Sequence, residues 1–536
     1  MGLHLEPNTP VNSDRLQFYL KGYDTHLSKY LVHGFKYGFK IHNMAFTPRD
    51  VDKNLRTATY MPHIVEKKID KELTAGRIVG PFHHSPFSDF MISPLGLREK
   101  KVPGEYRVIH DLSYPQGQSV NSGIPREFAT VSYSTVADAV KHILHFGWGC
   151  FLAKTDILSA FRIIPVHPDD VHLLGFKWNG MYYFDKCLPM GCSSSCSIFE
   201  AFSTSLEWIM SQRYPHIGIV HLLDDFLFVC STYDKCLEVL DSFKELCLDI
   251  GVPLSEEKTF GPEQILPFAG IELNTVDMYA RLPDDKLAKF IMHIDETLSS
   301  QSITKKKLDS VCGMLNYACS IIPSARAFTR RLYDIGIGVS KSFYKIKVTK
   351  QVQQDLMVWR LFLQQYNKQT FFLDYIWHNA DKLHLYTDAS TSIGYGGVFG
   401  THWFAGVWEE ECYGLNITLL ELYPICLALS MWGETLSNKC IVLHTDNIAV
   451  VSIINNSTCK DTKIMALVRR LVLVCMSHNI LVHAVHLPGS SNQISDSLSR
   501  QELNKALKLA PYLDKVMTPV PPKFHLSKWL QELKTY

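Results

Sequence analysis

The sequence predicts a multidomain protein that combines α/β and α+β folds. At 536 residues the chain is too long for a single hydrophobic core. Its content of 46% hydrophobic and 20% charged residues is typical of folded globular domains. Apolar, strand-like runs recur along the chain, and several of them end in a carboxylate that is followed by a helical pattern.

The composition restricts the partners that the chain can have. The formal net charge is only +1, so any nucleic acid must be held by local basic patches. The 14 cysteines show no spacing typical of zinc ligands, and we expect them to be reduced thiols. The opening MGLHLEPNTP lacks an apolar signal core, and no apolar run is long enough to span a membrane. We therefore expect a cytoplasmic or nuclear protein that is not secreted and does not bind membranes.

An apolar run over residues 217–230 contains two adjacent carboxylates, Asp224 and Asp225. One interpretation is a plain β-hairpin with strands over 219–223 and 226–230 and the aspartates as its turn. The other interpretation is a functional site. Unpaired buried carboxylates are costly, and two neighbours repel each other, so we expect the pKa of one of them to rise. The hairpin pattern alone fits both interpretations.

A third carboxylate follows an earlier strand. The stretch CFLAKTDILSAF predicts a buried strand that ends at Asp156, before the start of a helix, although an N-cap aspartate would also fit. Further on, YYFDKCLPMGCSSSCSIF predicts a strand, a tight turn of small residues over 191–197 and a long helix. If Asp156, Asp224 and Asp225 lie on neighbouring strands, they form a platform for Mg²⁺ ions. Two such ions about 4 Å apart can activate a 3′-hydroxyl and stabilise a leaving pyrophosphate.

The C-terminal part contains a second set of carboxylates. Asp388 ends a strand that is followed by two further strand patterns, Glu421 lies near the start of an apolar helix, and Asp446 ends the strand CIVLHT. Asp496 lies in the helix that NQISDSLSR begins. We expect one mixed sheet with helices packed on it. Each residue alone could be a helix cap or a solvated side chain, but four such cases in this order favour a site.

These motifs together resemble known enzyme families. KTDILSAF, LPMGCSSSCSIF and HLLDDFLF, in this order, resemble the A, B and C motifs of reverse transcriptases, and SPLGLREKKVPGEYRVIHDLS resembles their fingers segment. YTDAS, LLELYPI, HTDN and SDSLSR resemble the motifs of a ribonuclease H domain. The stretches YLVHGFKYGF, IDKELTAGRIVGPF and VIHDLSYPQGQSVNSGI are similar to DIRS-type retrotransposons, and this likeness covers most of residues 8–500.

The resemblance implies a right-hand polymerase with fingers, palm and thumb, a helical connection and a C-terminal ribonuclease H-like domain. The boundaries that we expect are 1–75 for an N-terminal extension, 76–275 for fingers and palm, 276–378 for thumb and connection, 379–500 for the ribonuclease H-like domain and 501–536 for a tail. The tail contains the proline-rich stretch MTPVPPKF, which predicts an extended strap or linker.

The resemblance also implies roles for individual residues. The implied catalytic and metal-binding residues are Asp156, Asp224 and Asp225 in the polymerase and Asp388, Glu421, Asp446 and Asp496 in the ribonuclease H domain. The implied substrate-binding residues are Lys100, Arg107, Phe161, Met190, Gly191 and Lys258. Lys100, or Lys101 in its place, and Arg107 would contact the incoming triphosphate. Phe161 would block a ribose 2′-hydroxyl, and Lys258 falls near a proton donor to the pyrophosphate.

The implied cofactors are Mg²⁺ or Mn²⁺, two ions in each active site. The implied partners are an RNA template, a DNA primer, an RNA–DNA hybrid and deoxynucleoside triphosphates, and other retroelement proteins could join them. Three positions depart from the family patterns. Leu222 stands where many members have tyrosine, Met190 where retroviruses have glutamine, and Ser490 or Ser491 where retroviral relatives have histidine. None is a metal ligand.

Two further readings of the chain remain open. A domesticated or partly inactive relative could bind nucleic acid without catalysis, and a ribonuclease H could accompany an inactive polymerase.

Basic and aromatic residues alternate over 301–350, at Lys305 to Lys307, Arg330, Arg331 and Lys345 among others, which predicts a thumb that tracks a nucleic-acid backbone. A solvated basic helix face is the alternative.

Overall fold

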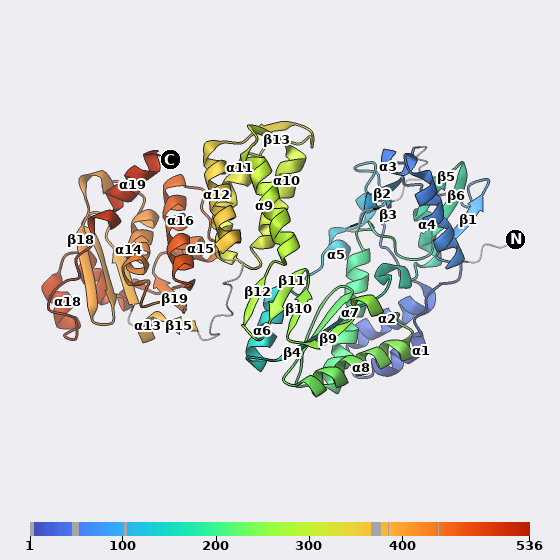
Figure 1. Ribbon diagram of the computed structural model, residues 1–536, viewed down its shortest axis with the longest axis horizontal. Helices are drawn as coiled ribbons and strands as arrows, with labels where there is room; N and C mark the ends of the chain where they lie inside the picture. The colour runs from blue at the N-terminus through green and yellow to red at the C-terminus, as the bar shows by residue number, and fades with distance from the viewer. Residues whose placement is uncertain are drawn as a thin grey trace. The chain divides into compact units, whose positions relative to one another are not determined.

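The computed structural model describes residues 5–45, 53–100, 104–365, 377–383, 385–437 and 439–535. The chain divides into two compact units, one of residues 1–269 and 273–276 and the other of residues 270–272 and 277–536. Each unit combines helices with β-sheets (Figure 1), so the predicted multidomain, mixed α/β fold is confirmed.

The first unit begins with helices that pack into its main core. Asn12 and Asp24 start α1 and α2 because their side chains accept hydrogen bonds from free backbone N–H groups of the first turn. Leu16 of α1 and Leu31 and Phe35 of α2 belong to the same hydrophobic cluster as the central sheet. The first four helices are α1 (Ser13–Tyr19), α2 (Thr25–Tyr37), α3 (Arg56–Thr59) and α4 (Pro62–Thr74).

Two small sheets follow in the chain, and they share a second, smaller hydrophobic core. The strands β1 (Ile78–Phe82), β6 (Met181–Asp185) and β5 (Gly175–Trp178) form a three-stranded antiparallel sheet in this order. The strands β2 (Leu95–Glu99) and β3 (Tyr106–His110) form a hairpin. Helix α4 packs against β1 and β3, and its Val65 and Ile69 join Leu95 and Phe176 in the small core.

The central sheet of the first unit carries the predicted polymerase aspartates. Its four strands lie in the order β7 (Gly218–Leu222), β8 (Asp225–Cys230), β4 (Phe151–Asp156) and β9 (Phe260–Glu263), and neighbours are antiparallel. The predicted hairpin and the adjacency of the two aspartate-bearing segments are both confirmed. The helices packed on the sheet are α6 (Val136–Phe146), α7 (Ser195–Arg213) and α8 (Tyr233–Ile250).

The chain passes towards the second unit through β10 (Ile265–Phe268), β11 (Ile271–Asn274) and β12 (Tyr279–Arg281). The second unit then begins with a helical part. Its helices are α9 (Asp284–Leu298), α10 (Lys305–Ala318), α11 (Arg330–Asp334) and α12 (Lys350–Gln365). A short hairpin of β13 (Ser302–Thr304) and β14 (Lys345–Lys347) lies among them.

Several basic residues of this helical part form internal ion pairs. Lys305 pairs with Asp309 and Arg330 with Asp334, one turn further along the same helix. Arg331 lies 3.4 Å from Asp355, a carboxylate with 3% side-chain exposure. Nearby carboxylates thus engage both guanidinium groups, and phosphate binding by Arg330 and Arg331 stays a prediction.

Asp355 connects α12 to the remainder of the second unit. Its second oxygen lies 3.4 Å from Arg469 of α16 (Thr462–Ser477), so two arginines from different helices share one buried carboxylate. Burial raises the pKa of Asp355 to about 6, and the two arginines oppose this effect. Removing either arginine would leave the carboxylate half-paired away from water, which is costly.

The C-terminal part of the second unit contains two sheets. The strands β16 (Leu385–Ala389), β17 (Gly394–Phe399) and β18 (His402–Val407) form an antiparallel sheet. The strands β15 (Trp377–Asn379), β19 (Cys440–Thr445) and β20 (Leu481–His486) form a parallel one. The predicted single mixed sheet is therefore wrong for the described residues, although β16 and β19 lie close together. The strands of the antiparallel sheet follow one another through short turns, and the parallel strands β19 and β20 are joined through helices, as each type of pairing requires.

Helices cover both sheets, and a glycine-rich strand allows one of them to approach closely. A Cβ atom on Gly396 of β17 would lie 2.4 Å from the side chain of Leu498, so only glycine lets α17 pack there. The remaining helices of this part are α13 (Ala380–Leu383), α14 (Ile417–Trp432), α15 (Ile448–Asn456), α17 (Gln493–Ser499), α18 (Leu503–Leu509) and α19 (Leu526–Thr535).

The C-terminal segment packs on the same part of the second unit. Trp403 donates a hydrogen bond of 2.8 Å to the carbonyl of Asp514. Trp529 of α19 contacts the rings of Tyr423 and lies under the guanidinium group of Arg470. The tail thus packs on this part of the unit, and it contains the helices α18 and α19 beside the proline-rich stretch.

All 14 cysteines are free thiols. Within the described ranges, no helix is both long and apolar enough to cross a membrane.

A buried histidine joins the central sheet of the first unit to α7. His221 of β7 is 3% exposed, and its Nε2 lies 3.1 Å from Glu200 while its Nδ1 contacts Glu207. Burial lowers the pKa of His221, but the hydrogen bonds and charges of the two glutamates outweigh this effect and raise it to about 9. The ring is therefore a charged link between strand and helix near neutral pH.

This link predicts a loss of stability in alkaline solution. Because the folded-state pKa of His221 lies above its ordinary value of 6.5, the contribution is complete below about pH 6.5 and disappears as the pH rises through about 9. We expect His221→Gln to flatten the fall of the unfolding temperature between pH 7 and 10. Thermal unfolding followed by circular dichroism measures this. His216→Gln, at an exposed position of the same segment, is the control. An equally steep fall in both variants would refute the assignment.

Candidate active sites

The turn of the β7–β8 hairpin brings three aspartates together in the first unit. In the register of the sheet Asp225 lies opposite Asp156, the last residue of β4. Leu223 has φ of 55°, a left-handed conformation that turns the chain within Leu223 and Asp224. The N–H of Ile157 donates a hydrogen bond of 2.9 Å to the carbonyl of Asp224, which holds the turn beside the end of β4. The aspartates are thus both a hairpin turn and a carboxylate cluster.

The charges of these carboxylates are poorly balanced by the protein. Burial raises the pKa of Asp224, and the charge of Asp156 adds to this effect. Burial likewise raises the pKa of Asp225 to about 6; Lys154 opposes the rise, and the two other aspartates strengthen it. The buried Oδ1 of Asp225 has no hydrogen-bond partner. A buried acceptor without a donor, next to two further carboxylates, suits a divalent cation.

Lys258 occupies part of this cluster. Its Nζ lies 2.9 Å from both oxygens of Asp156, so a cation at Asp156 must compete with an ammonium group. Lys258 is also close to where the resemblance places a proton donor. In the part of the chain that the structure describes, a set of three acidic ligand atoms within 4.8 Å occurs in the second unit and not here.

The predicted triphosphate contacts line one cavity of about 200 Å³ in the first unit. Lys100, Arg107 and Met190 belong to its wall. Lys100 forms an ion pair of 2.8 Å with Glu105, and the charge of Arg107 is among those that lower the pKa of Asp224. Arg107 therefore lines the cavity and is close enough to Asp224 for its charge to act there. Lys101 lies outside the described residues.

Phe161 lies on the short 3₁₀ turn that follows β4, η2 (Ala160–Ile163). Its ring is half-buried and meets the ring of Phe199 on α7 edge to face, with 5.6 Å between the centroids. The side chain packs against the main core of the unit. This position is compatible with a role beside the nucleotide sugar and equally with a purely structural role.

The tight turn at Gly191 is held by a residue that the sequence did not reveal. Asn121 donates a hydrogen bond of 2.8 Å to the carbonyl of Gly191 and accepts one of 2.9 Å from the N–H of Ser193. Gly191 has φ of 113°, and a Cβ atom there would lie 2.9 Å from the carbonyl oxygen of His110. Asn121 thus positions the turn next to Met190. No spacing pattern marks this asparagine, because its partners are far away in the sequence.

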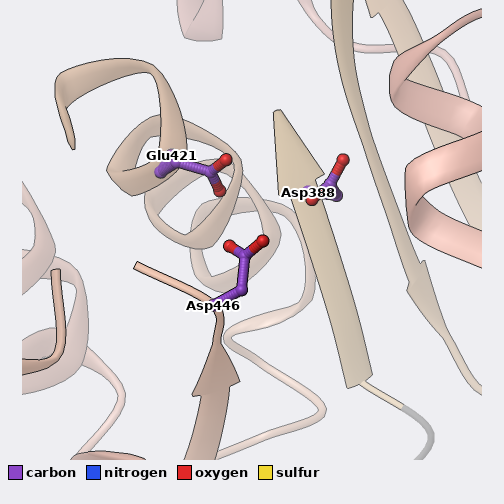
Figure 2. A group of neighbouring side chains, drawn as sticks. All are labelled: Asp388, Glu421 and Asp446. Atoms are coloured by element: carbon purple, nitrogen blue, oxygen red, sulfur yellow. The ribbon is translucent and has the colours of Figure 1, made fainter. Parts of the chain in front are cut away.

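The second unit brings three predicted carboxylates to one point. Asp388 at the end of β16, Glu421 on α14 and Asp446 after β19 each offer an oxygen within 4.8 Å of the others. Figure 2 shows the three carboxylates facing the space between these elements. The fourth predicted residue, Asp496 on α17, lies outside this group and forms an ion pair of 2.7 Å with Arg500. Its charge still contributes to the raised pKa of Asp388, so it lies nearby.

Mutual repulsion is strong at this second site. Burial raises the pKa of Glu421 to about 9, and the charges of Asp388 and Asp446 add to the rise. Burial also raises the pKa of Asp388 to about 6, although the hydroxyl of Ser499 donates a hydrogen bond of 2.6 Å to it. Carboxylates that are held together in this way fit hard divalent cations, whose charge removes the repulsion.

The loop where the sequence lacks the expected histidine closes one side of this site. A Cβ atom on Gly489 would lie 3.0 Å from an Asp446 oxygen, so the loop backbone passes close to the carboxylate. Ser490 and Ser491 follow in the 3₁₀ turn η7 (Gly489–Ser491). Asn492 donates a hydrogen bond of 2.9 Å to the carbonyl of Thr387 and anchors the loop to β16. Sequence reasoning also missed this asparagine and Ser499.

Comparison with known proteins shows a similarity in the first unit. Residues 100–273 match the family model described as "Reverse transcriptase (RNA-dependent DNA polymerase)", and this range includes Asp156, Asp224 and Asp225. This part of the chain is therefore similar to reverse transcriptases, including those of retroviral, hepadnaviral and pararetroviral Pol proteins.

Individual relatives are distant. The "Putative enzymatic polyprotein" of Cassava vein mosaic virus is 22% identical over 370 residues, which are 65% of this chain and 52% of the relative. "Protein P" of Ground squirrel hepatitis virus (strain 27) is 24% identical over 268 residues, 49% of this chain and 27% of the relative. The "Pro-Pol polyprotein" of Simian foamy virus type 1 is 24% identical over 243 residues, which are 45% of this chain and 19% of the relative. The chain thus spans about half or less of the length of these relatives.

Solved structures of foamy viral protease-reverse transcriptases are also similar. For the structure in complex with an RNA/DNA hybrid, the TM-score is 0.49 at 16% identity, and the similarity covers 89% of this chain and 61% of the foamy viral chain. For the structure in complex with double-stranded DNA, the TM-score is 0.47 at 16% identity, and the similarity covers 90% of this chain and 98% of the foamy viral chain.

The charge pattern around Glu421 predicts how cations affect stability. A carboxyl with a pKa of about 9 is mostly protonated at pH 7, so Glu421→Gln should unfold near the wild-type temperature without cations. Added Mg²⁺ or Mn²⁺ should raise the unfolding temperature of the wild type, and more at pH 9 than at pH 6, because binding displaces a proton. The variant should lose most of this rise.

Thermal-shift measurements with and without the metal test this prediction. Glu411→Gln changes an exposed glutamate of the same unit and should keep the full cation effect. A cation-induced rise in Glu421→Gln that equals that of Glu411→Gln would contradict cation binding at Glu421.

Proposed function

We propose that the protein is an RNA-directed DNA polymerase with ribonuclease H activity and that it serves the replication of a DIRS-type retrotransposon. The observation that carries the polymerase assignment is the register that sets Asp156 opposite Asp225, inside the segment that matches the reverse transcriptase family. Support for the hybrid as substrate comes from the similar foamy viral enzyme whose structure holds an RNA/DNA hybrid. The retrotransposon role rests on the sequence resemblance.

In this proposal fingers and palm occupy residues 76–275, and the aspartates of the central sheet hold two Mg²⁺ or Mn²⁺ ions. Such ions, when bound, activate the primer 3′-hydroxyl and neutralise the leaving pyrophosphate. Arg107 and Lys100 bind the triphosphate from the fingers side. Lys258, freed from Asp156, is placed to donate a proton to the pyrophosphate. Asn121 keeps the turn at Gly191 in place beneath the nucleotide.

The second unit supplies the ribonuclease in this proposal. Asp388, Glu421 and Asp446, with Asp496 nearby, hold the ions that activate water against the RNA strand of a hybrid. The thumb and connection are assigned to residues 276–378, the nuclease to 379–500 and a C-terminal tail to 501–536. Without a histidine in the loop at Ser490 and Ser491, product release depends on the carboxylates alone.

One observation favours a second candidate, a ribonuclease H beside an inactive polymerase. Lys258 neutralises Asp156, and the carboxylates of the second unit converge more closely than those of the first. A polymerase that cannot displace this lysine would bind hybrid and cleave its RNA without extending the primer.

Single substitutions should separate the two activities. Asp224→Asn should reduce primer extension on poly(rA)–oligo(dT) about a hundredfold or more, the scale of losing one transition-state contact, and leave RNA cleavage intact. Asp446→Asn should have the opposite effect, because the carboxylates belong to different units.

Asp285→Asn, at an exposed aspartate pair, should change neither activity. Extension by Asp224→Asn at the wild-type rate would exclude the polymerase site. Wild-type protein that cleaves hybrids but extends no primer would instead favour the second candidate.

Phe161 should control the choice of sugar. A ring beside the nucleotide leaves no room for a 2′-hydroxyl, and forcing it into a tight site costs about 1–3 kcal/mol, or about ten- to a hundredfold in rate. We expect Phe161→Val to raise the ratio of ribonucleotide to deoxynucleotide incorporation, measured with single nucleotides. Phe199→Val removes the same ring contact from the other side and is the control. If both variants keep the wild-type ratio, Phe161 is a core residue only.

A further inference from the structure

The cavity that Lys100, Arg107 and Met190 line has a third cation in its wall. Lys68 of α4 faces the same space of about 200 Å³. No sequence motif points to this residue, which lies in the helical pattern IVEKKIDKEL like an ordinary surface lysine. The fold, however, brings α4 against β3, the strand that carries Arg107.

The charges deeper in the cavity balance one another. Arg162 lies 2.6 Å from Asp185 and 2.9 Å from Glu72, and Arg77 lies 3.6 Å from the other oxygen of Glu72. This network needs no further ion. Binding of an anion must therefore depend on the cations nearer the rim.

The rim carries excess positive charge. Lys100 is partly neutralised by Glu105, at 2.8 Å. Neither Lys68 nor Arg107 forms an ion pair among the described residues, although the charge of Glu105 also acts on Lys68. Burial lowers the pKa of Lys68, and the positive charge of Lys100 lowers it further, so the two ammonium groups are close enough to repel each other. Cations that repel each other at the wall of a cavity indicate a site for an anion.

The helix holds Lys68 in place for such a role. Val65 and Ile69 on the same side of α4 are buried in the small core, and Lys68 is half-buried beside them. Lys67, the preceding residue, is exposed. The position of the Lys68 ammonium is therefore set by packing, which lowers the entropy that is lost when it binds a ligand.

We propose that Lys68 is a third phosphate-binding residue of the polymerase site and contacts the polyphosphate of the incoming nucleoside triphosphate together with Lys100 and Arg107. The proposal rests on the proposed polymerase function of the first unit. A triphosphate concentrates several negative charges in a small volume, which matches three converging cations better than one phosphodiester of a template strand does. An ammonium group carries three donors, so Lys68 can contact more than one phosphate oxygen from this position.

Steady-state kinetics of single-nucleotide addition test the proposal on the full chain. Lys68→Met keeps the apolar stem and removes the charge. We expect it to raise the KM for dTTP on poly(rA)–oligo(dT) about tenfold, the effect of one lost charge-assisted hydrogen bond. Lys68→Arg should restore most of the affinity. Lys67→Met is the matched control and should behave as wild type.

Two equilibrium measurements distinguish the outcomes. The Kd for the template–primer should be the same in all variants, and an increase confined to this Kd would overturn the proposal and assign Lys68 to the template strand. Calorimetric titration with inorganic tripolyphosphate should show about tenfold weaker binding to Lys68→Met than to Lys67→Met. This second measurement needs no catalysis, so wild-type protein that adds no nucleotide disproves the polymerase function but still allows the test of Lys68. Equal tripolyphosphate binding by the two variants would overturn the proposal.

Discussion

The burial of neighbouring carboxylates is the constraint on which both units depend. In the first unit burial raises the pKa of Asp225 to about 6, and in the second it raises the pKa of Glu421 to about 9; in both, repulsion by neighbouring carboxylates adds to the rise. Each raised pKa means that the folded chain disfavours the charged form of the group. The surrounding structure must therefore hold these side chains together although their charges repel one another. A bound cation would remove the repulsion, and the free energy released would contribute to the affinity for the cation.

The apolar framework provides the opposing free energy. Residues 226–230 of β8, directly after the aspartate pair, are all buried between the neighbouring strands and helices. Helix α14 around Glu421 is buried over almost its whole length, on all sides. Burial of such side chains stabilises by about 1.5–3 kcal/mol each, so several of them together offset the cost of one perturbed carboxyl. In both units the carboxylate thus lies in or beside a buried apolar segment.

Local patterns in the sequence predicted the helices and strands. The features that the sequence did not predict depend on contacts between residues far apart in the chain. The alternation of strands, the turn at Asp224 and the start of α7 follow from spacings within a few residues, and the structure has them. The pairing of Lys258 with Asp156 joins residues about a hundred positions apart, and that of Asn121 with Gly191 about seventy. A helical or strand period does not encode such distances.

The partners of charged residues could not be predicted for the same reason. Arg331 stands among basic and aromatic residues in the sequence, yet its carboxylate partner Asp355 comes from the next helix. The division of the C-terminal strands into two sheets also depends on pairing between distant segments. Composition shows that such groups exist, but only the folded chain shows which of them are already satisfied.

The sharing of Asp355 by Arg331 and Arg469 has a consequence for the divergence of related chains. A substitution of one arginine leaves a buried carboxylate half-compensated, and a substitution of Asp355 leaves the buried Arg469 and the half-buried Arg331 without this counter-charge. Replacement of all three by apolar side chains of similar volume avoids both costs. Single changes at these positions are therefore destabilising, whereas simultaneous changes of all three are tolerated. We expect positions 331, 355 and 469, which link α11, α12 and α16, to covary among homologues.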